Sequence, residues 1–256
     1  MYQDLEAQLH DVFWSEEENA NEMPLLRDFL IQRPGRSLEV GCGSGRLLLQ
    51  LLPEFNIEGS EISADMVSLL KNEAQKQQLS PVIHQGDILA TKLPNRYNSI
   101  TIPAFTLQLF NRSEAHKLLM MLRSATADSG ALYISVFIPW SEIIDELEQG
   151  TWHLDKSSQL KDGSVATCET RHQIDRVNQT LDRQHRYQLK HPNRKAQTHR
   201  SSQHLQWYLL PELKLLLSNC GWVYQTHHTD FILGTQDPDA SILTITAEAA
   251  NQGTRL

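Results

Sequence analysis

Three glycines at alternating positions, Gly41, Gly43 and Gly45, lie between a short apolar run and a leucine-rich segment. Because glycine has no Cβ, a ligand can approach the backbone of such a turn, and the first N–H groups of the following helix can point at it. Arg46 occupies the position of the third glycine in a dinucleotide-binding turn, and the Gly-Lys-Ser/Thr of a P-loop is missing. The turn is therefore a candidate ligand site that matches neither motif, with a plain strand–helix connection as the alternative.

Two acidic residues follow at the ends of later apolar runs. Glu61 comes roughly 20 residues after Gly41, where doubly wound folds place a carboxylate that accepts both hydroxyls of a ribose. Asp87 closes the next run. Since the carboxyl ends of parallel strands share one edge of a sheet, we expect these acids to lie beside the glycine turn. A solvated residue at a helix entry is the alternative for Glu61.

The elements that must position these residues alternate along the chain. Apolar runs predict strands at 37–40, 56–61, 82–85, 98–103 and 131–138, and periodic segments predict helices at 46–52, 64–77 and 114–126. Ser63 is placed to cap the second of these helices. A helix at 211–220, which Gly221 ends, and strands at 222–228 and 241–247 complete the pattern. Alternation of this kind predicts an α/β fold with a parallel sheet covered on both faces.

Two segments depart from the alternation. Residues 1–34 form an expected N-terminal helical arm, with the capping-box spacing of Ser15 and Glu18 and an end at Pro34. Residues 140–204 interrupt the α/β pattern, and the polar stretch 165–189 predicts an antiparallel hairpin that turns near Asn178. We expect this insertion and the arm to act as a lid over the ligand site, with ordinary packing as the alternative.

Composition narrows the class of protein. The 256 residues are 40% hydrophobic and 21% charged, which is typical of a globular chain, and no apolar run approaches the roughly 20 residues that cross a bilayer. The start of the chain is acidic and polar where a secretory signal is basic and apolar, so we expect a cytoplasmic protein. Cys42, Cys168 and Cys220 form no C-x-x-C pair and predict reduced thiols without a metal site.

Charge is distributed unevenly. The formal net charge is -8, which argues against broad nucleic-acid binding. Residues 171–200, however, contain eight Lys and Arg against two Asp. This segment either attracts an anionic partner or forms a solvated face, and we favour solvation.

Several motifs together resemble the class I S-adenosylmethionine-dependent methyltransferases over nearly the whole chain. They are LEVGCGSGRL at residues 38–47, GSEISADM at 59–66 and GDI at 86–88. Residues 100–109, 130–132, 136–139 and 205–213 are similar to a bacterial subgroup with diverse small-molecule acceptors. Gln206 stands where that subgroup usually has arginine.

The resemblance implies a single methyltransferase domain over residues 1–256. Its fold would be α/β, with a seven-stranded doubly wound sheet in the order 3-2-1-4-5-7-6. Strand 7 would be antiparallel, helices would cover both faces, and an antiparallel hairpin insertion would follow strand 5. The implied methyl donor is S-adenosyl-L-methionine, which leaves as S-adenosyl-L-homocysteine.

The resemblance also implies roles around the donor. The glycines would wrap the methionine portion and Glu39 would receive its ammonium group. Glu61 would hold the ribose, and Asp87 would accept from the adenine amino group. The implied donor-binding residues are Glu39, Gly41, Cys42, Gly43, Gly45, Glu61, Ile62, Met66, Asp87, Ile88, Phe105 and Gln108.

Methyl transfer needs an acceptor aligned with the S–CH3 bond in a water-poor cleft, and no covalent enzyme intermediate. The implied substrate-binding residues are Trp14, Phe105, Gln108 and Tyr187. Candidates for a base are His153, His172, His185, Tyr187 and Asp230, each with a bystander role as its alternative. The predicted partner is a small-molecule substrate and no membrane, and the sequence leaves the oligomeric state open.

Two other functions remain as alternatives. One is a methyltransferase acting on RNA or another nucleic acid through the basic segment 171–200, although residues 102–105 read Ile-Pro-Ala-Phe and not the Asn/Asp-Pro-Pro-Tyr/Phe used on base amines. The other is a non-catalytic protein that binds the cofactor and transfers nothing.

Overall fold

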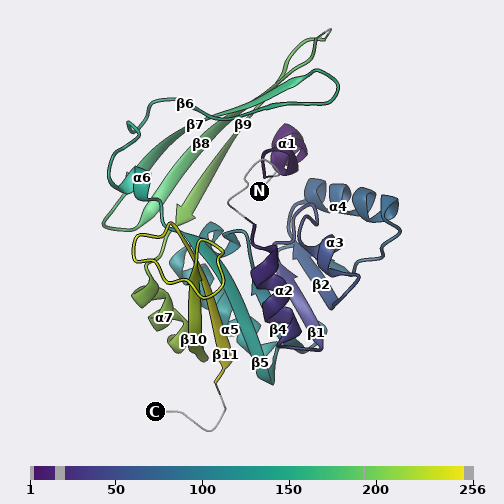
Figure 1. Cartoon of the computed structure of the whole chain (residues 1–256), viewed down its shortest axis with the longest axis vertical. Helices are drawn as coiled ribbons and strands as arrows, with labels where there is room; N and C mark the ends of the chain where they lie inside the picture. The colour runs from purple at the N-terminus through teal and green to yellow at the C-terminus, as the bar shows by residue number, and fades with distance from the viewer. Residues whose placement is uncertain (1–2, 15–20, 193, 251–256) are drawn as a thin grey trace.

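The computed structural model describes residues 3–14, 21–192 and 194–250. It contains an α/β body and a separate antiparallel sheet that stands beside one end of that body (Figure 1). The N-terminal helix α1 (Asp4–Trp14) lies between the two, so three segments distant in sequence meet there.

The body is built on a seven-stranded sheet in the order β10-β11-β5-β4-β1-β2-β3. Its strands are β1 (Arg36–Val40), β2 (Asn56–Glu61), β3 (Ile83–Gln85), β4 (Tyr97–Ile102), β5 (Thr126–Phe137), β10 (Trp222–Thr229) and β11 (Ile242–Ala249). Strands β1 to β5 pair in parallel, whereas β11 runs antiparallel to both β5 and β10. The predicted strand order and the antiparallel seventh strand are confirmed.

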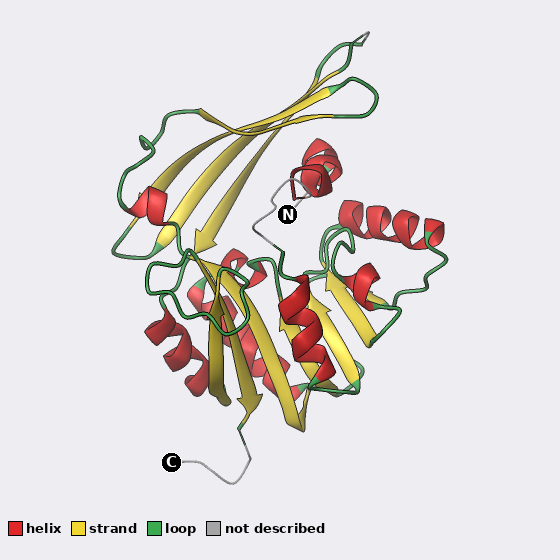
Figure 2. Ribbon diagram, viewed as in Figure 1, coloured by secondary structure: helices red, strands yellow, loops and turns green. Residues whose placement is uncertain are grey.

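Helices cover both faces of this sheet (Figure 2). They are α2 (Met23–Ile31), α3 (Leu48–Leu51), α4 (Ala64–Lys76), the 3-10 helix η1 (Thr106–Leu109), α5 (Arg112–Ser124) and α7 (Leu210–Asn219). Alternate residues of β5 reach the two faces: Leu132 and Ile134 join the core under α5 and α7, while Ala131 and Tyr133 join the core under α2 and α3. This two-sided burial explains why the central strands are almost continuously apolar.

Local signals in the sequence set the start of α4 and the end of α7. Ser63 caps α4, since its side chain accepts a hydrogen bond from the N–H of Met66 at 3.2 Å. Gly221 follows α7 with φ of +80°, as expected for a glycine after a helix. The helix predicted at 46–52 is shorter and keeps α-helical geometry only in α3.

The second sheet has four antiparallel strands in sequence order: β6 (His153–Gln159), β7 (Val165–Asp175), β8 (Thr180–Lys190) and β9 (Gln197–Gln206). The short helix α6 (Trp140–Ile143) leads into it. The predicted hairpin is β7 and β8, which pair from Val165 and Lys190 to Asp175 and Thr180. The outer strands were missed because β6 and β9 are too polar to show apolar alternation.

The predicted N-terminal arm divides between the two units. Helix α1 packs Leu5, Leu9 and Phe13 against the second sheet, whereas α2 packs on the main sheet. The capping-box pair predicted at Ser15 and Glu18 lies outside the described residues. In the three described ranges, every helix is too short or too polar to traverse a bilayer.

Candidate functional site

The glycine turn connects β1 to α3 and is bonded to the neighbouring strand. The N–H groups of Gly41 and Cys42 both donate to the carbonyl oxygen of Ser60, at 2.9 and 3.0 Å. A Cβ on Gly41 would lie 2.5 Å from Thr106 Cγ2, whereas a Cβ on Gly43 would meet no atom within 4 Å. Close packing therefore requires the first glycine, while the second leaves open space in front of its backbone.

A cavity of about 430 Å³ opens at this turn, at the carboxyl edge of β1 and β2. Its volume lies in the usual range for small-ligand pockets. The body supplies one wall, and α1 and β9 supply the other. Of the predicted donor-binding residues, those that line it are Glu39, Gly41, Cys42, Gly43, Glu61, Ile62, Met66, Asp87 and Ile88.

Glu61 ties two parts of the cavity wall together. Its Oε2 accepts a hydrogen bond from the N–H of Gly43 at 2.9 Å, and its Oε1 accepts one from the N–H of Ser63 at 2.7 Å. A carboxylate offers about four acceptor positions, so further donors can still bind to it. Glu61 thus holds the glycine turn against the start of α4 and keeps acceptor capacity at the cavity.

Glu39 is buried on β1 and differs from Glu61 in its surroundings. Its Oε2 has no hydrogen-bond partner. Burial and, after it, the carboxylate of Glu22 raise the pKa of Glu39 to about 8, although Arg46 acts in the opposite direction. The cavity therefore has a buried carboxyl group with a free oxygen on its wall, which suits a cationic group of a ligand.

Asp87 and its neighbours form the edge of the cavity beyond β3. The Oδ1 atom of Asp87 accepts from the N–H of Leu89 at 2.9 Å, and the N–H of Gly86 donates to the carbonyl of Glu61 at 2.8 Å. Met66 is fully buried beside this edge, whereas the side chain of Ile62 is 50% exposed. An apolar slot with an acid at its end is consistent with the predicted adenine site.

The opposite wall contains residues that the sequence motifs do not reveal. These are Glu6 and His10 of α1, together with Ser202, Gln203 and His204 of β9. Glu6 is buried, and its Oε1 accepts hydrogen bonds from Tyr187 at 3.2 Å and from Ser201 at 2.8 Å. No local signal marks them, because they reach the cavity only through packing of α1 on the second sheet.

Three of the predicted donor-binding residues do not line the cavity. Gly45 packs under Leu49 and Leu70. The Gln108 amide binds the backbone of Phe137 through both its oxygen and its nitrogen, at 2.8 and 3.0 Å. Phe105 packs against the rings of Phe137 and Phe231, with centroids 5.2 and 6.1 Å away. Their proposed roles toward donor and acceptor stay predictions, as does that of Trp14, whose side chain is outside the described part.

The predicted base candidates are not among the residues that line the cavity. Nδ1 of His185 bonds Thr170 Oγ1 at 2.9 Å, and burial lowers the pKa of His185 to about 4. Burial also lowers the pKa of His172, whose ring stacks edge-on to that of His153 with centroids 6.4 Å apart. The Oδ1 atom of Asp230 accepts from the N–H of Ile242 at 3.0 Å in a turn. Tyr187 lies nearest the cavity, through its bond to Glu6.

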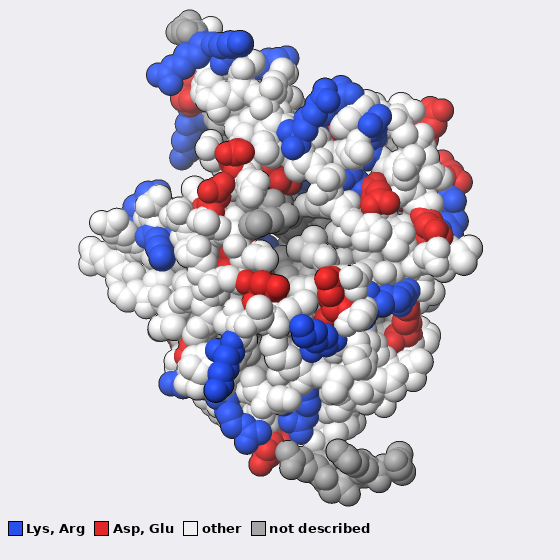
Figure 3. All heavy atoms as spheres, turned by 180° about the vertical axis from the view of Figure 1, so that it is seen from behind, with Lys and Arg blue, Asp and Glu red and all other residues white. Residues whose placement is uncertain are grey.

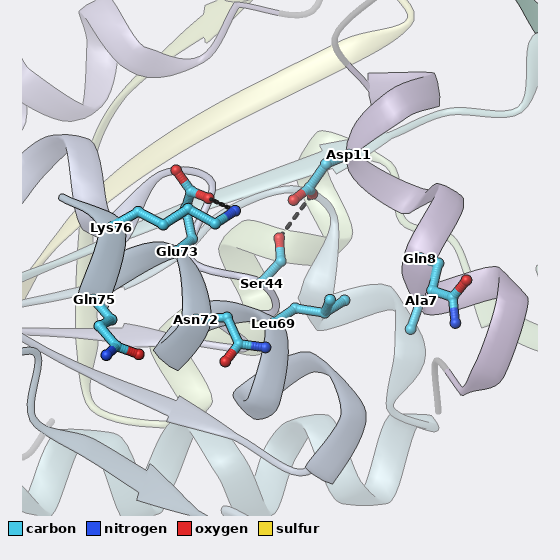
Figure 4. Close-up of a pocket in the computed structure, with 9 residues that line it drawn as sticks. All are labelled: Ala7, Gln8, Asp11, Ser44, Leu69, Asn72, Glu73, Gln75 and Lys76. Atoms are coloured by element: carbon cyan, nitrogen blue, oxygen red, sulfur yellow. Dashed lines mark hydrogen bonds and ion pairs between the residues drawn. The ribbon is translucent and has the colours of Figure 1, made fainter. Parts of the chain in front are cut away.

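A groove between α1 and α4 adjoins the cavity (Figure 4). Within it, the Ser44 hydroxyl of the glycine turn donates to Asp11 Oδ1 of α1 at 2.7 Å. Burial works to raise the pKa of Asp11, but hydrogen bonds from His10 and Ser44 outweigh it and the pKa is lowered. The ionised carboxylate of α1 is thus latched to the same turn that borders the cavity.

Part of the chain matches a known family model. Residues 38–130 match a family model described as a methyltransferase domain. No curated protein sequence matches the chain. The matched residues include the glycine turn, Glu39, Glu61 and Asp87, so the resemblance seen in the motifs is confirmed.

Solved structures share the whole architecture. An S-adenosylmethionine-dependent methyltransferase from Clostridium acetobutylicum ATCC 824 is 11% identical with a TM-score of 0.80, covering 95% of this chain and 97% of that one. The sugar N-methyltransferase KedS8 from Streptoalloteichus sp ATCC 53650 is 16% identical with a TM-score of 0.73, covering 98% and 96%. CalS10, an amino pentose methyltransferase from Micromonospora echinaspora, is 14% identical with a TM-score of 0.70, covering 96% and 98%. These likenesses extend through the second sheet and confirm the predicted fold.

Proposed function

We propose that this chain, which carries a methyltransferase domain at residues 38–130, is an S-adenosylmethionine-dependent methyltransferase with a small-molecule acceptor. The observation that carries the proposal is the cavity itself. Its wall combines the open backbone of Gly43, the acids Glu61 and Asp87 at successive strand ends, and the buried free oxygen of Glu39.

The residues present fit the donor. Glu39 would accept from its ammonium group, Glu61 would accept from its ribose hydroxyls, and Ile62 and Met66 would enclose its adenine beside Asp87. The donor supplies an electrophilic methyl group when bound. The chain itself holds the donor in one orientation, through a carboxylate at each end of the cavity.

Walls on both sides of the cavity serve the transfer. Helix α1 and strand β9 cover the edge of the body and restrict water, which strengthens the electrostatic interactions inside. Transfer by in-line displacement needs an acceptor held near the methyl group, and no covalent bond to the protein. Glu6, His10 and His204 are placed on the wall where an acceptor would enter, and each can bind a hydroxyl or an amine.

The acceptor we infer is a small polar molecule such as an amino sugar. Hydrogen-bonding side chains on α1 and β9 support this inference, because they would recognise hydroxyl and amino groups. Structures of a sugar N-methyltransferase and an amino pentose methyltransferase share the full fold, second sheet included.

The basic segment 171–200 gives little support to a nucleic-acid acceptor. Arg176 pairs with Asp145 at 2.7 Å, and Arg183 pairs with Glu142 at 2.5 Å. Arg171 and Arg186 lie over the ring of Trp152, with centroid distances of 4.8 and 3.6 Å. Lys and Arg are interspersed with Asp and Glu on the face shown in Figure 3, which lacks one continuous basic surface.

Two further assignments belong to the same proposal. The chain would form one domain in which α1 and the second sheet act as a lid on the cavity. It would work in the cytoplasm, where the free thiols of Cys42, Cys168 and Cys220 stay reduced.

Calorimetry with S-adenosylhomocysteine, followed by a methyl-transfer assay, tests the proposal. We expect binding of the nucleoside, and turnover with at least one member of a set of amino sugars and hydroxylated metabolites. Absence of nucleoside binding by folded protein would overturn it. Binding without turnover on any acceptor would instead favour the non-catalytic alternative, and turnover on RNA would favour the nucleic-acid one.

A further inference from the structure

Two glutamates from distant segments are buried together at the carboxyl edge of the main sheet. Glu22 directly precedes α2 and is 1% exposed, and Glu39 on β1 is 2% exposed. Each keeps one oxygen without a hydrogen-bond partner, Oε1 of Glu22 and Oε2 of Glu39. Unpartnered carboxylate oxygens are costly to bury in ionised form, so the pair needs a cation or a proton.

The groups that face this pair come from four segments of the chain. Ala104 after β4 donates its N–H to Glu22 Oε2 at 2.9 Å, and the hydroxyls of Tyr133 and Ser135 on β5 lie toward the same carboxyl group. Arg46 of the glycine turn is the cation that lowers the pKa of both glutamates. Glu61 on β2 adds a negative charge beside Glu39. Burial, together with the charges of Glu39 and Glu61, raises the pKa of the Cys42 thiol.

The balance of these groups favours a shared proton. Burial raises the pKa of both glutamates, and Glu22 is the largest charged contribution to the raised pKa of Glu39, ahead of Arg46 and Glu61. With the pKa of Glu39 at about 8, the pair binds a proton at neutral pH.

Only one member of the pair reaches the cavity. Glu39 and Ala104 line it, whereas Glu22 does not line it and is bonded to the backbone of Ala104. Glu22 therefore acts on a ligand through Glu39.

We propose that Glu22 is a positioning residue for donor binding: it keeps a proton on Glu39 in the free protein, and the donor's ammonium group displaces that proton. This inference rests on the proposed function. The O–H bond of the Glu39 carboxyl group breaks, its electron pair stays on the oxygen, and the proton leaves to the buffer. The carboxylate then accepts an N–H of the ammonium group, so binding of the donor releases about one proton.

The mechanism sets the pH dependence of affinity. Below the pKa of the pair, affinity rises about tenfold for each unit of pH, because a proton must leave before the ammonium group binds. Removal of the Glu22 charge lowers the pKa of Glu39 and moves this dependence to lower pH. Removal of the Arg46 charge moves it to higher pH.

Titration calorimetry with S-adenosylhomocysteine at pH 7.0, in two buffers of different ionisation enthalpy, counts the protons released. At this pH the ammonium group of the ligand is still charged. We expect about one proton for the natural chain, fewer for Glu22→Gln, and none for Glu39→Gln. Glu22→Asp keeps the charge and should restore the release, and Glu146→Gln, at an exposed glutamate, should match the natural chain.

Arg46→Gln gives an independent measurement should Glu22→Gln fail to fold, since it should extend proton release to higher pH. Binding without proton release, or equal release by Glu22→Gln and the natural chain, would overturn the role of Glu22 while leaving the proposed function intact. Failure of the natural chain to bind the nucleoside would overturn both. A loss of affinity with unchanged proton release would mean that Glu22 is merely structural.

Discussion

Glu39 and Glu61 lie near the ends of neighbouring strands, but the backbone treats them differently. Glu61 accepts two backbone N–H groups, whereas Glu39 keeps a buried oxygen without a partner. Burial without donors favours the protonated form of a carboxyl group, and the pKa of Glu39 is raised accordingly. The same residue type is therefore suited to hold neutral hydroxyls at one position and a cation at the other.

Glu61→Ala should weaken binding of S-adenosylhomocysteine by about 1 to 3 kcal/mol, through loss of charge-assisted hydrogen bonds and loosening of Gly43. Calorimetry measures this change. The control is Glu54→Ala, an exposed residue outside the cavity. Equal affinity of Glu61→Ala and the natural chain would contradict the assignment.

Glu39 should also make folding stability depend on pH. Its pKa of about 8 in the folded chain exceeds its ordinary value of 4.5, so its contribution is complete below pH 4.5 and is lost as pH rises through 8. In the natural chain this effect should lower the free energy of unfolding by about 2 to 4 kcal/mol between pH 5.5 and 8.5. The Glu39→Gln variant should lack that decrease. Urea denaturation at both pH values tests this, and an unchanged slope would argue against the raised pKa.

At the scale of elements, α1 is held in place by contacts with residues that are distant in sequence. It buries Leu5, Leu9 and Phe13 on the second sheet, and it binds the glycine turn through Asp11 and Ser44. Its position therefore links the two walls of the cavity. The side of α1 that faces α4 borders the groove between these two helices.

Leu9→Ala should release α1 from the second sheet, since truncation of a buried leucine costs about 2 to 5 kcal/mol. The backbone amides of α1 should then exchange hydrogen at least ~10-fold faster. A tenfold change in exchange rate corresponds to a smaller free energy than the truncation costs. Mass spectrometry measures the exchange. Gln8→Ala, at an exposed position of the same helix, should leave it unchanged. Unaltered exchange in Leu9→Ala would show that α1 is held by other contacts.

At the scale of the whole molecule, arginines of the basic segment 171–200 form ion pairs with acids from outside that segment. The basic segment 171–200 has two acids of its own, yet Arg176 and Arg183 pair with Asp145 and Glu142 from the preceding segment. The net charge of -8 then repels a polyanion at long range.

Fluorescence anisotropy with a labelled single-stranded RNA should therefore show no binding at micromolar protein and physiological salt. Phosphate-driven binding would appear as an affinity that falls steeply with salt concentration. The matched comparison is the variant with Lys195→Glu, which should behave as the natural chain does. Strong, salt-sensitive binding that this variant loses would support the nucleic-acid alternative.

The alternation of strands and helices, the glycine turn and the acids at strand ends were predictable from the sequence alone. Each depends on residues near one another in the chain: Ser63 caps the helix that begins beside it, and Gly41 follows the strand that it ends. Parallel pairing then brings the strand ends to one edge without further information. This is why Glu61 and Asp87 lie beside the glycine turn, whereas the strand order and the other predicted cavity residues followed from the resemblance to known methyltransferases.

Only the tertiary structure decided the second wall of the cavity and the partner of Glu39. Glu6 meets Tyr187 across 181 positions of sequence, and Glu22 reaches Glu39 through the packing of α2. The polar strands β6 and β9 also pair without a local apolar pattern to announce them. These contacts form because the residues are buried against segments far along the chain. Local propensity depends on neighbouring residues and does not predict which distant segment will be the partner.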